Sequence, residues 1–485
     1  MKPLYFAGYF LENGRARIAW KHRSDTVNYG ALVCWEGGEV RTEAQSVLLD
    51  GAPGTVSLYA LDAEGGRSLM AELKRAEAFA LPQTLEEPNQ EQVRIVSAED
   101  GAYFCVQDAP MFLRGFNFIG LNPDHCTFEP SCYDPLTAEV MLARLRPLGY
   151  NVVRVFIMSG RNDLNPGVSG GRAHNDGRFD PAYMANVLHF MKLCRRYGFR
   201  LLPNFGDNEI VCNRYYEAIS GGCDRMQVYF SEGAVRAKAM MVEEFLRCVR
   251  EEDEGLLSTL LALQMQNEFC FNENAAPFTQ REGVYRLYDG SEYDMTDDHQ
   301  RRALAFHAAE LYYSRIRDTV KRAAPGLLLC EGSFTMRAVG KSIENSYGFH
   351  SGAQDERLPF SALEYLRLPL DFLDMHVYCE DGDNAEEAFS ANFRNMLLEE
   401  PEARELMRRK PVIMGEFNSF KKNRRTGDFA VARQTILGLR DSAIRHGFAG
   451  FLLWTVDTFY QREIWHMMED GGDFARALAD TERRG

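Results

Sequence analysis

The sequence lacks a long apolar run. No apolar stretch reaches the roughly 18 residues that a membrane-spanning helix requires, so we expect no membrane partner. The first residues carry one lysine, a proline and an apolar stretch that ends at Glu12, which does not fit a secretory leader. We therefore expect a cytoplasmic protein.

The chain also lacks an excess of positive charge. Lysine and arginine number 55 against 70 aspartates and glutamates, which gives a formal net charge of −15. Nucleic acids and anionic membranes bind basic patches, so neither is an expected partner. A hydrophobic content of 45% over 485 residues indicates a globular protein large enough for a barrel and an accessory domain.

The cysteines lack the spacing of a metal site. They number eleven, and several lie in apolar segments, as buried reduced thiols do. The pairs Cys126/Cys132 and Cys212/Cys223 lie in expected loops, where they would bridge or bind metal, but neither has the two-pair spacing of a zinc site. We expect no metal and no cofactor.

The first part of the chain predicts a small antiparallel sandwich. Short strand-like runs alternate there with turns rich in Gly, Asp and Glu. The runs are Leu4–Phe10, Val27–Trp35, Ser46–Leu49 and Thr55–Leu61. Residues 82–92 are polar with two prolines and are typical of a linker, so we expect an accessory domain over 1–92 and a second domain over 93–485.

The second part predicts a (β/α)₈ barrel. A hairpin over 93–113 leads into alternating strand-like and amphipathic segments, and such alternation is typical of parallel strands with helical crossovers. The eight expected strands are Leu113–Gly120, Val152–Ile157, Arg200–Asn204, Thr259–Gln266, Gly326–Glu331, Phe372–Val377, Val412–Gly415 and Phe448–Trp454. The alternative is an open doubly wound sheet, but the Gly-rich phosphate loop usual after its first strand is missing.

Polar side chains stand at the ends of these strands, where barrel enzymes hold their active sites. Glu268 follows the fourth strand and Glu416 follows the apolar run of the seventh. The other candidates on this rim are Asn117, Arg154, Asn204, Asn267, His376, Tyr378 and Trp454. Each also has a structural interpretation: Arg154 as a buried ion-pair partner, His376 and Tyr378 as a hydrogen-bonded core pair, and Trp454 as packing.

Two carboxyl groups that flank one bond are what glycoside hydrolysis needs. One protonates the leaving group and the other attacks the sugar. Glu268 and Glu416, far apart in sequence but on one predicted rim, fit this requirement.

The ordered motifs resemble clan A glycoside hydrolases, most closely family 5, the cellulase- and mannanase-like enzymes. The motifs are Leu113-Arg-Gly-Phe-Asn117, Leu148-Gly-Tyr-Asn-Val-Val-Arg154, Gln266-Asn-Glu268, Asp374-Met-His-Val-Tyr378, Pro411-Val-Ile-Met-Gly-Glu416 and Gly450-Phe-Leu-Leu-Trp454. The third strand lacks the histidine often found there, and Phe269 replaces the usual proline.

The resemblance implies a role for each matching residue. Glu268 is the expected acid/base and Glu416 the expected nucleophile, supported by Arg154. His376 and Tyr378 line the site, and Trp454 forms a floor for the sugar. We further expect Asn267 to bind the sugar 2-hydroxyl, and Phe269 to keep Glu268 protonated while Arg154 and Tyr378 keep Glu416 charged.

The sequence therefore predicts a retaining β-glycosidase that acts on oligosaccharides or glycosides without a cofactor. Two alternatives stay open: a barrel that binds carbohydrate without cutting it, and a transglycosylase that uses the same pair. The sugar, the linkage, endo or exo action and the oligomeric state are not encoded in these motifs.

Overall fold

In the computed structural model, the described part of the chain consists of residues 4–22, 29–80, 91–99, 101–119, 127–130, 133–157, 176–206, 214–222, 226–341, 355–379, 384–419, 429–456, 467 and 473–481. Several of the expected loop features fall outside these residues. They are the cysteine pairs Cys126/Cys132 and Cys212/Cys223 and most of the linker over 82–92. Among the described residues no helix is long and apolar enough to cross a membrane.

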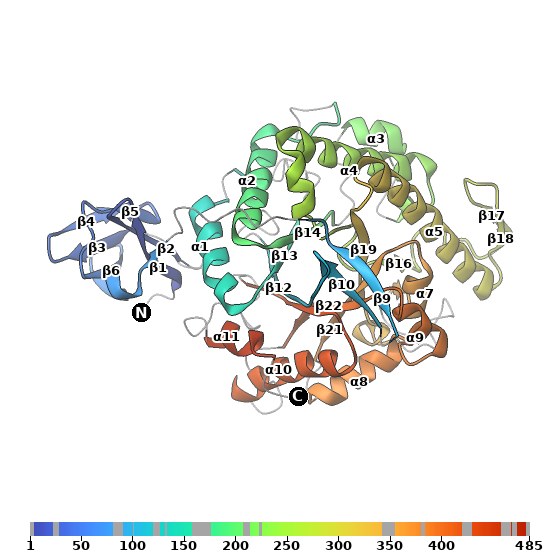
Figure 1. Ribbon diagram of the computed structural model, residues 1–485. Helices are drawn as coiled ribbons and strands as arrows, with labels where there is room; N and C mark the ends of the chain where they lie inside the picture. The colour runs from blue at the N-terminus through green and yellow to red at the C-terminus, as the bar shows by residue number, and fades with distance from the viewer. Residues whose placement is uncertain are drawn as a thin grey trace.

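Eight parallel strands close into a barrel, and helices surround it (Figure 1). The strands are β12 (Leu113–Phe118), β13 (Val152–Phe156), β14 (Arg200–Asn204), β15 (Ala262–Gln264), β19 (Leu328–Phe334), β21 (Phe372–Tyr378), β22 (Val412–Asn418) and β23 (Gly450–Leu453). All eight expected strands are present in sequence order around the barrel, so the (β/α)₈ prediction is confirmed and the doubly wound alternative is wrong.

Helices alternate with the barrel strands along the chain. They are α1 (Pro135–Leu145), α2 (Pro181–Tyr197), α3 (Arg214–Ser220), α4 (Glu232–Glu252), α5 (Asp298–Ala323), α7 (Ala362–Arg367), α8 (Ala385–Asn395), α9 (Pro401–Met407), α10 (Phe429–Arg445) and α11 (Asp473–Ala479). The 3₁₀ turns are η1 (Arg75–Glu77), η2 (Arg146–Leu148), η5 (Gln227–Tyr229), η6 (Glu254–Thr259) and η7 (Met336–Val339).

Local sequence fixes where the longest helices begin. Asp180, Ser231 and Asp297 cap α2, α4 and α5, each by accepting a backbone N–H of the first turn. Gly198 ends α2 with φ of 71°, a left-handed conformation that favours glycine. These helices carry their apolar faces onto the barrel strands, which are buried on both faces.

A short antiparallel sheet closes the end of the barrel at which the strands begin, called the lower end below. It contains β9 (Arg94–Ala98), β10 (Gly101–Val106) and β11 (Ala109–Met111). Phe104 of β10 reaches into the apolar layer formed by the strand beginnings, where its ring meets that of Phe372 edge-on at 5.1 Å. The expected hairpin is thus confirmed, and it plugs the end opposite to the predicted active site.

The N-terminal segment forms two four-stranded sheets that lie beside α1 (Figure 1). One holds β1 (Leu4–Glu12), β2 (Arg15–His22), β5 (Ser46–Leu48) and β8 (Phe79–Ala80). The other holds β3 (Ala31–Trp35), β4 (Gly38–Thr42), β6 (Thr55–Leu61) and β7 (Arg67–Lys74). The expected β-rich accessory fold is confirmed, but β2, β4, β7 and β8 were not among the expected strands, since β8 has two residues and the other three carry several charged residues.

This N-terminal unit packs on the barrel through a small contact. Phe10 and Ala19 form a buried cluster with Val140 of α1, and Arg144 donates to the carbonyl of Ala7 at 2.9 Å. The unit has its own core around Trp20 and Val33. The boundary near residue 92 stays a prediction.

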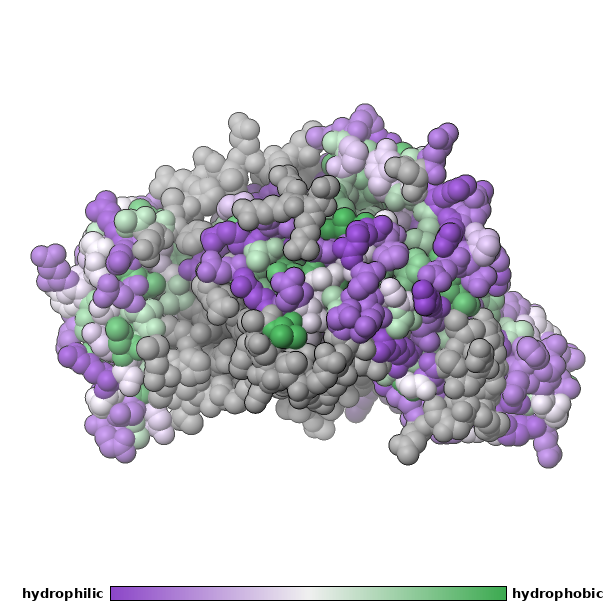
Figure 2. Space-filling view, turned by 90° about the horizontal axis from the view of Figure 1, so that it is seen from below, coloured by the Kyte–Doolittle hydropathy of each residue, from purple (hydrophilic) through white to green (hydrophobic). Residues whose placement is uncertain are grey.

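Short antiparallel pairs extend the barrel beyond strands four and five. One joins β16 (Cys270–Asn272) to β20 (Arg357–Pro359), and the other joins β17 (Val284–Arg286) to β18 (Glu292–Asp294). On the face shown in Figure 2, hydrophilic residues predominate among the coloured ones, and hydrophobic residues appear as small separate patches. Large continuous apolar patches mark docking surfaces, and none is visible among those coloured residues.

Candidate active site

Glu268 and Glu416 lie side by side at the carboxyl end of the barrel. Glu416 sits on β22 directly beside His376 of β21, and Glu268 follows β15 across the rim. One oxygen of each carboxylate and one nitrogen of His376 lie within 4.8 Å of one another. Two glutamates from distant parts of the sequence therefore face one space.

Arg154 of β13 holds the centre of the site. Its Nη1 lies 2.5 Å from Oε1 of Glu416, and its Nη2 donates to Oδ1 of Asn267 at 2.7 Å. The same Nη1 donates to Oδ1 of Asn117 at 2.8 Å. The guanidinium is completely buried, so it fixes the orientation of Glu416 and of the segment that carries Glu268.

Below Arg154 lies a polar layer that sequence reasoning missed. Gln264 accepts from Nε of Arg154 at 2.6 Å and donates to Oδ2 of Asp374 at 2.8 Å. Both side chains are fully buried in strands that otherwise read as apolar. The sequence offers one signal for Asp374. Side chains at every second position of a strand point to the same face, so Asp374 shares its face with His376 and Tyr378.

Space for Asp374 depends on a glycine of the neighbouring strand. A Cβ on Gly415 would stand 1.9 Å from Oδ1 of Asp374, so any other residue there would displace the carboxylate. Gly415 is also the residue directly before Glu416. Gly415 therefore makes room for the buried Asp374 carboxylate, and the next residue supplies the carboxylate of the site, Glu416.

Asn117 and Asn204 support the site from below and are fully buried. Asn117 donates to the carbonyls of Gly415 and Leu453 at 2.9 and 3.2 Å. Asn204 donates to Oε1 of Gln264 at 2.7 Å and to the carbonyl of Gln266 at 2.8 Å. Both therefore bind protein groups, and their predicted contact with substrate stays a prediction.

His376 bridges the two glutamates. Its Nδ1 lies 3.0 Å from Oε1 of Glu268 and 3.4 Å from Oε2 of Glu416, and its Nε2 faces Oδ2 of Asp374 at 3.8 Å. Burial by itself would lower the pKa of His376, but the charges of Glu416, Asp374 and Glu268 outweigh it and raise the pKa to about 10. An imidazolium therefore stands among three carboxyl groups.

Tyr378 contacts Glu416 directly, whereas Trp454 packs against apolar side chains. The Tyr378 hydroxyl donates to Oε2 of Glu416 at 3.0 Å, and 37% of the tyrosine is exposed. Trp454 is 6% exposed and packs with Ile119 and Phe156, whose ring it meets edge-on at 6.0 Å. The predicted role of Trp454 as a floor for the sugar stays a prediction.

The proton affinities of the two glutamates differ from our expectation. Burial raises the pKa of Glu416, although His376 and Arg154 oppose the effect. Burial also acts on Glu268, but the hydrogen bond and charge of His376 hold its pKa below the usual value. The two pKa values are thus shifted in the directions opposite to those expected.

The reason lies in the direction of one side chain. Phe269, expected to shield Glu268, is 1% exposed and packs instead among Tyr229, Phe271 and Phe360. The neighbour of Glu268 is therefore a charged imidazole and not an apolar ring. Glu268 is also the more accessible of the two glutamates, with 30% of its side chain exposed against 4% for Glu416.

One imidazole and two carboxylates also match the donors of a divalent metal ion, and within the described residues Glu268, His376 and Glu416 form such a cluster. Two cations already compensate these groups. Arg154 lies 2.5 Å from Glu416, and His376 carries a positive charge at neutral pH. A metal ion would have to replace the proton of His376 and compete with Arg154 for Glu416, so this cluster does not fit a resident metal ion.

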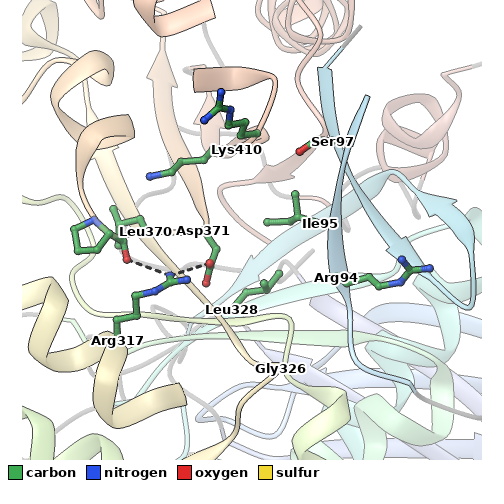
Figure 3. A pocket seen from close by; sticks show the side chains of 11 residues that line it. Arg94, Ile95, Ser97, Arg317, Gly326, Leu328, Leu370, Asp371 and Lys410 are labelled. Atoms are coloured by element: carbon green, nitrogen blue, oxygen red, sulfur yellow. Dashed lines mark hydrogen bonds and ion pairs between the residues drawn. The ribbon is translucent and has the colours of Figure 1, made fainter. Parts of the chain in front are cut away.

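A separate hollow lies at the opposite end of the barrel (Figure 3). Its charged side chains bind neighbouring protein atoms. Arg317 donates to Asp371 and to the carbonyl of Pro369 at 2.8 and 3.3 Å, and Lys410 donates to the carbonyls of Leu366 and Leu368 at 2.7 Å each. Arg317 and Lys410 are thus bound to neighbouring protein groups at this end of the barrel.

Further polar and aromatic residues lie at or just after the expected strand ends in the sequence. Asn122, Asp207, Asn208, Glu209, Asp457 and Tyr460 lie outside the described residues. Cys270 is half-buried in β16, and Phe118 is buried against Phe190 with ring centroids 5.4 Å apart. Phe118 therefore belongs to the packing and not to the sugar-facing surface.

Comparisons with known proteins agree with this fold. No protein-family model and no curated protein sequence matches the chain. Among solved structures, an exo-β-1,4-mannosidase from an Opitutaceae bacterium is similar with a TM-score of 0.50 and 14% identity, over 79% of this chain and 62% of that chain. An endo-1,4-β-D-mannanase from Thermotoga petrophila gives a TM-score of 0.50 and 14% identity, over 76% of this chain and 99% of that one.

At 14% identity, the similarity to these structures shows a shared fold only. It confirms that the resemblance inferred from the sequence motifs holds for the barrel architecture of these glycoside hydrolases. The chain spans about 62% of the length of the mannosidase, so its activity must be argued from its own site.

Proposed function

We propose that this chain is a retaining β-glycosidase that cleaves O-glycosidic bonds of oligosaccharides or glycosides by double displacement. The observation that carries the proposal is the placement of Glu268 and Glu416, whose nearest oxygens lie within 4.8 Å. Carboxyl groups about 5–5.5 Å apart are typical of retaining enzymes, whereas inverting enzymes need about 6.5–9.5 Å to admit water.

Glu416 is the proposed nucleophile. Arg154 and Tyr378 bind its two oxygens at 2.5 and 3.0 Å, so the attacking group is fixed before the substrate arrives. The Arg154 charge also favours the carboxylate once Glu416 has lost its proton. Attack on the anomeric carbon forms a glycosyl-enzyme and releases the aglycone.

Glu268 is the proposed acid/base. It is the more exposed glutamate and reaches both solvent and the leaving group, as a residue that exchanges protons must. Since Nδ1 of His376 faces both glutamates, it offers a path for the proton from Glu416 to Glu268. The reaction requires the proton on Glu268 and the charge on Glu416, the reverse of the pKa directions described above, and His376 is the group through which that proton would move.

The remaining site residues have supporting roles in this proposal. Asn267, oriented by Arg154, binds the sugar 2-hydroxyl, and Trp454 and Tyr378 contact the sugar from the side of strands eight and six. Because Arg154 is fully buried, it does not contact the sugar itself and acts only by orienting Glu416 and Asn267. No step requires a cofactor.

The sugar is proposed by analogy to be a β-mannoside, because both similar structures with a TM-score of 0.50 are described as acting on β-1,4-mannosidic bonds. Fold likeness alone does not carry substrate identity. The first experiment therefore tests a panel of aryl β-glycosides (mannoside, glucoside, galactoside, xyloside and cellobioside) with wild type, Glu416→Ala and Glu268→Ala.

The expected result is activity on one sugar, lost by on the order of 10⁶-fold in Glu416→Ala and restored in part by azide. For Glu268→Ala, azide should yield a β-glycosyl azide, since it attacks the glycosyl-enzyme without base catalysis. Binding of an oligosaccharide without any cleavage by wild type would favour the carbohydrate-binding alternative. Products longer than the substrate in the presence of an acceptor sugar would favour transglycosylation.

A further inference from the structure

Glu331 of β19 is a buried carboxyl group that the proposed mechanism does not use. It is 0% exposed, and three donors converge on it. Oε1 accepts from the backbone N–H of Gln266 at 3.1 Å and of Gly332 at 3.0 Å, and Oε2 accepts from the hydroxyl of Tyr313 at 2.6 Å. An acceptor of this kind holds its donors in fixed places.

One of these donors belongs to the segment that carries the acid/base. Residues 266–269 connect β15 to β16 and contain Asn267 and Glu268. After Glu268, the N–H of Phe269 donates to the carbonyl of Gly332 at 3.1 Å, and the Tyr365 hydroxyl donates to the carbonyl of Phe269 at 2.6 Å. The backbone on both sides of Glu268 is therefore tied to β19 and α7.

The segment lies directly against β19. A Cβ on Gly332 would stand 2.0 Å from the carbonyl oxygen of Asn267, so the close approach requires glycine. With Glu331 on one side of this contact and the Phe269 carbonyl on the other, Glu268 has little freedom to change its backbone position. Its side chain then meets His376 at 3.0 Å.

The chemistry of position 331 calls for a carboxyl group. Its Oε1 accepts from two backbone N–H groups and its Oε2 from the Tyr313 hydroxyl, an arrangement that needs two oxygens on one side chain. A glutamine of the same shape would turn an NH₂ group toward the backbone N–H groups or toward the Tyr313 hydroxyl. One of the three contacts would then be lost, and the 266–269 segment would shift or loosen.

We propose that Glu331 is a positioning residue that sets the place of Glu268 by binding the backbone N–H of Gln266, without touching the substrate. This inference rests on the proposed function, in which Glu268 is the acid/base. It predicts that a change of Glu331 slows proton transfer to the leaving group but does not slow the attack by Glu416.

Substrates with different leaving groups distinguish a loss of proton transfer from a loss of nucleophilic attack. A 2,4-dinitrophenyl glycoside departs without a proton, whereas a phenyl glycoside needs general acid help, which is worth about 10²–10⁴-fold. The test compares kcat/KM of Glu331→Gln on 2,4-dinitrophenyl and phenyl β-mannosides, or on the same glycosides of whichever sugar the wild type cleaves. kcat/KM reports the first, glycosylating step on both substrates.

The expected result is a loss of about 10–100-fold on the phenyl glycoside, as for a catalytic group displaced by about 1 Å, and less than about threefold on the dinitrophenyl glycoside. On the latter, kcat should fall because base-assisted hydrolysis of the glycosyl-enzyme is slow, and azide should restore it. An equal loss on both substrates, or no loss on either, would overturn the inference.

Two tyrosines supply a second variant and a matched control. Tyr313→Phe removes one donor to Glu331 and should give the same substrate-dependent loss in a weaker form. Tyr150→Phe removes an equally buried hydrogen bond, 2.7 Å to the carbonyl of Ala475, far from the site, and should leave the substrate ratio unchanged. If Glu331→Gln does not fold, a Tyr313→Phe ratio equal to that of Tyr150→Phe overturns the inference.

The proposed function is tested separately in the same experiment. Wild type that cleaves neither glycoside, or Glu268→Ala that matches wild type on the phenyl glycoside, would contradict the proposed function itself. A normal wild type and an impaired Glu268→Ala, together with an unchanged ratio in Glu331→Gln, would contradict only the positioning role.

Discussion

The two ends of the barrel are built from the same eight strands but hold opposite kinds of side chain. At the lower end, Phe104 and Phe372 lie in an apolar layer closed by the β9–β11 sheet. At the upper end, Arg154, Glu416 and their partners form a buried polar network. Parallel strands impose this division, because all of their carboxyl ends meet on one rim. The lower end should therefore determine stability, and the upper end should determine chemistry at some expense of stability.

The largest expected effect is at the upper end, in Arg154→Met. Removal of the guanidinium leaves Glu416 and Asp374 buried without their main cation, so the free energy of unfolding should fall by about 3–5 kcal/mol. Glycosidase activity should be lost as well, because nothing then fixes Glu416. Denaturant titration and steady-state kinetics measure the two effects.

Arg302→Met is the matched control for that variant. Arg302 is also buried and binds Glu364 through two contacts of 2.7 and 2.8 Å, but it lies on α5 outside the barrel. Stability should fall by a similar amount while kcat of the folded fraction is retained. Loss of kcat in both variants would mean that the two regions are not separable.

Phe104→Ala tests the lower end. The change removes the ring that fills the apolar layer and should cost about 3–5 kcal/mol of the free energy of unfolding. The polar network is built from other strand positions, so kcat/KM at a temperature where the variant is folded should stay within about twofold of wild type. A large change in kcat/KM would mean that the lower end also determines the chemistry.

Tyr378→Phe has a smaller effect that is confined to the upper end. The hydroxyl makes one hydrogen bond to Glu416, and bonds to charged groups contribute about 1.5–3 kcal/mol, so kcat/KM should fall by about 10–100-fold. Because 37% of Tyr378 is exposed, the melting temperature should change little. An unchanged kcat/KM would remove Tyr378 from the set that fixes the nucleophile.

A further prediction concerns the pH dependence of stability. Burial raises the pKa of Glu331 from 4.5 to about 8, against the opposing contacts from Tyr313 and the backbone. A pKa that is higher in the folded state gives stability that is complete below about pH 4.5 and is lost as the pH rises through about 8. Over this window the free energy of unfolding should decrease more steeply in wild type than in Glu331→Gln. Parallel curves would show that Glu331 does not titrate with this shift.

The residues of the site were predictable to the extent that they end a strand. Asn117, Arg154, Glu268, His376, Tyr378, Glu416 and Trp454 were identified because polar or aromatic residues follow apolar runs in a fixed order. Gln264 was missed, Asp374 was quoted only as part of a motif, and Glu331 was noted at the end of the fifth strand but not assigned to the site. A buried polar side chain within an apolar strand has meaning only through its partners, and those come from other strands.

The sequence by itself determined the eight-strand barrel, its hairpin and the position of two glutamates on one rim, because strand periodicity and the direction of parallel strands are local properties. The tertiary structure decided what surrounds each glutamate. It turned Phe269 away into an aromatic cluster and placed His376 at 3.0 Å from Glu268. Proton affinities depend on distances of a few ångströms between distant segments, and only packing sets those distances.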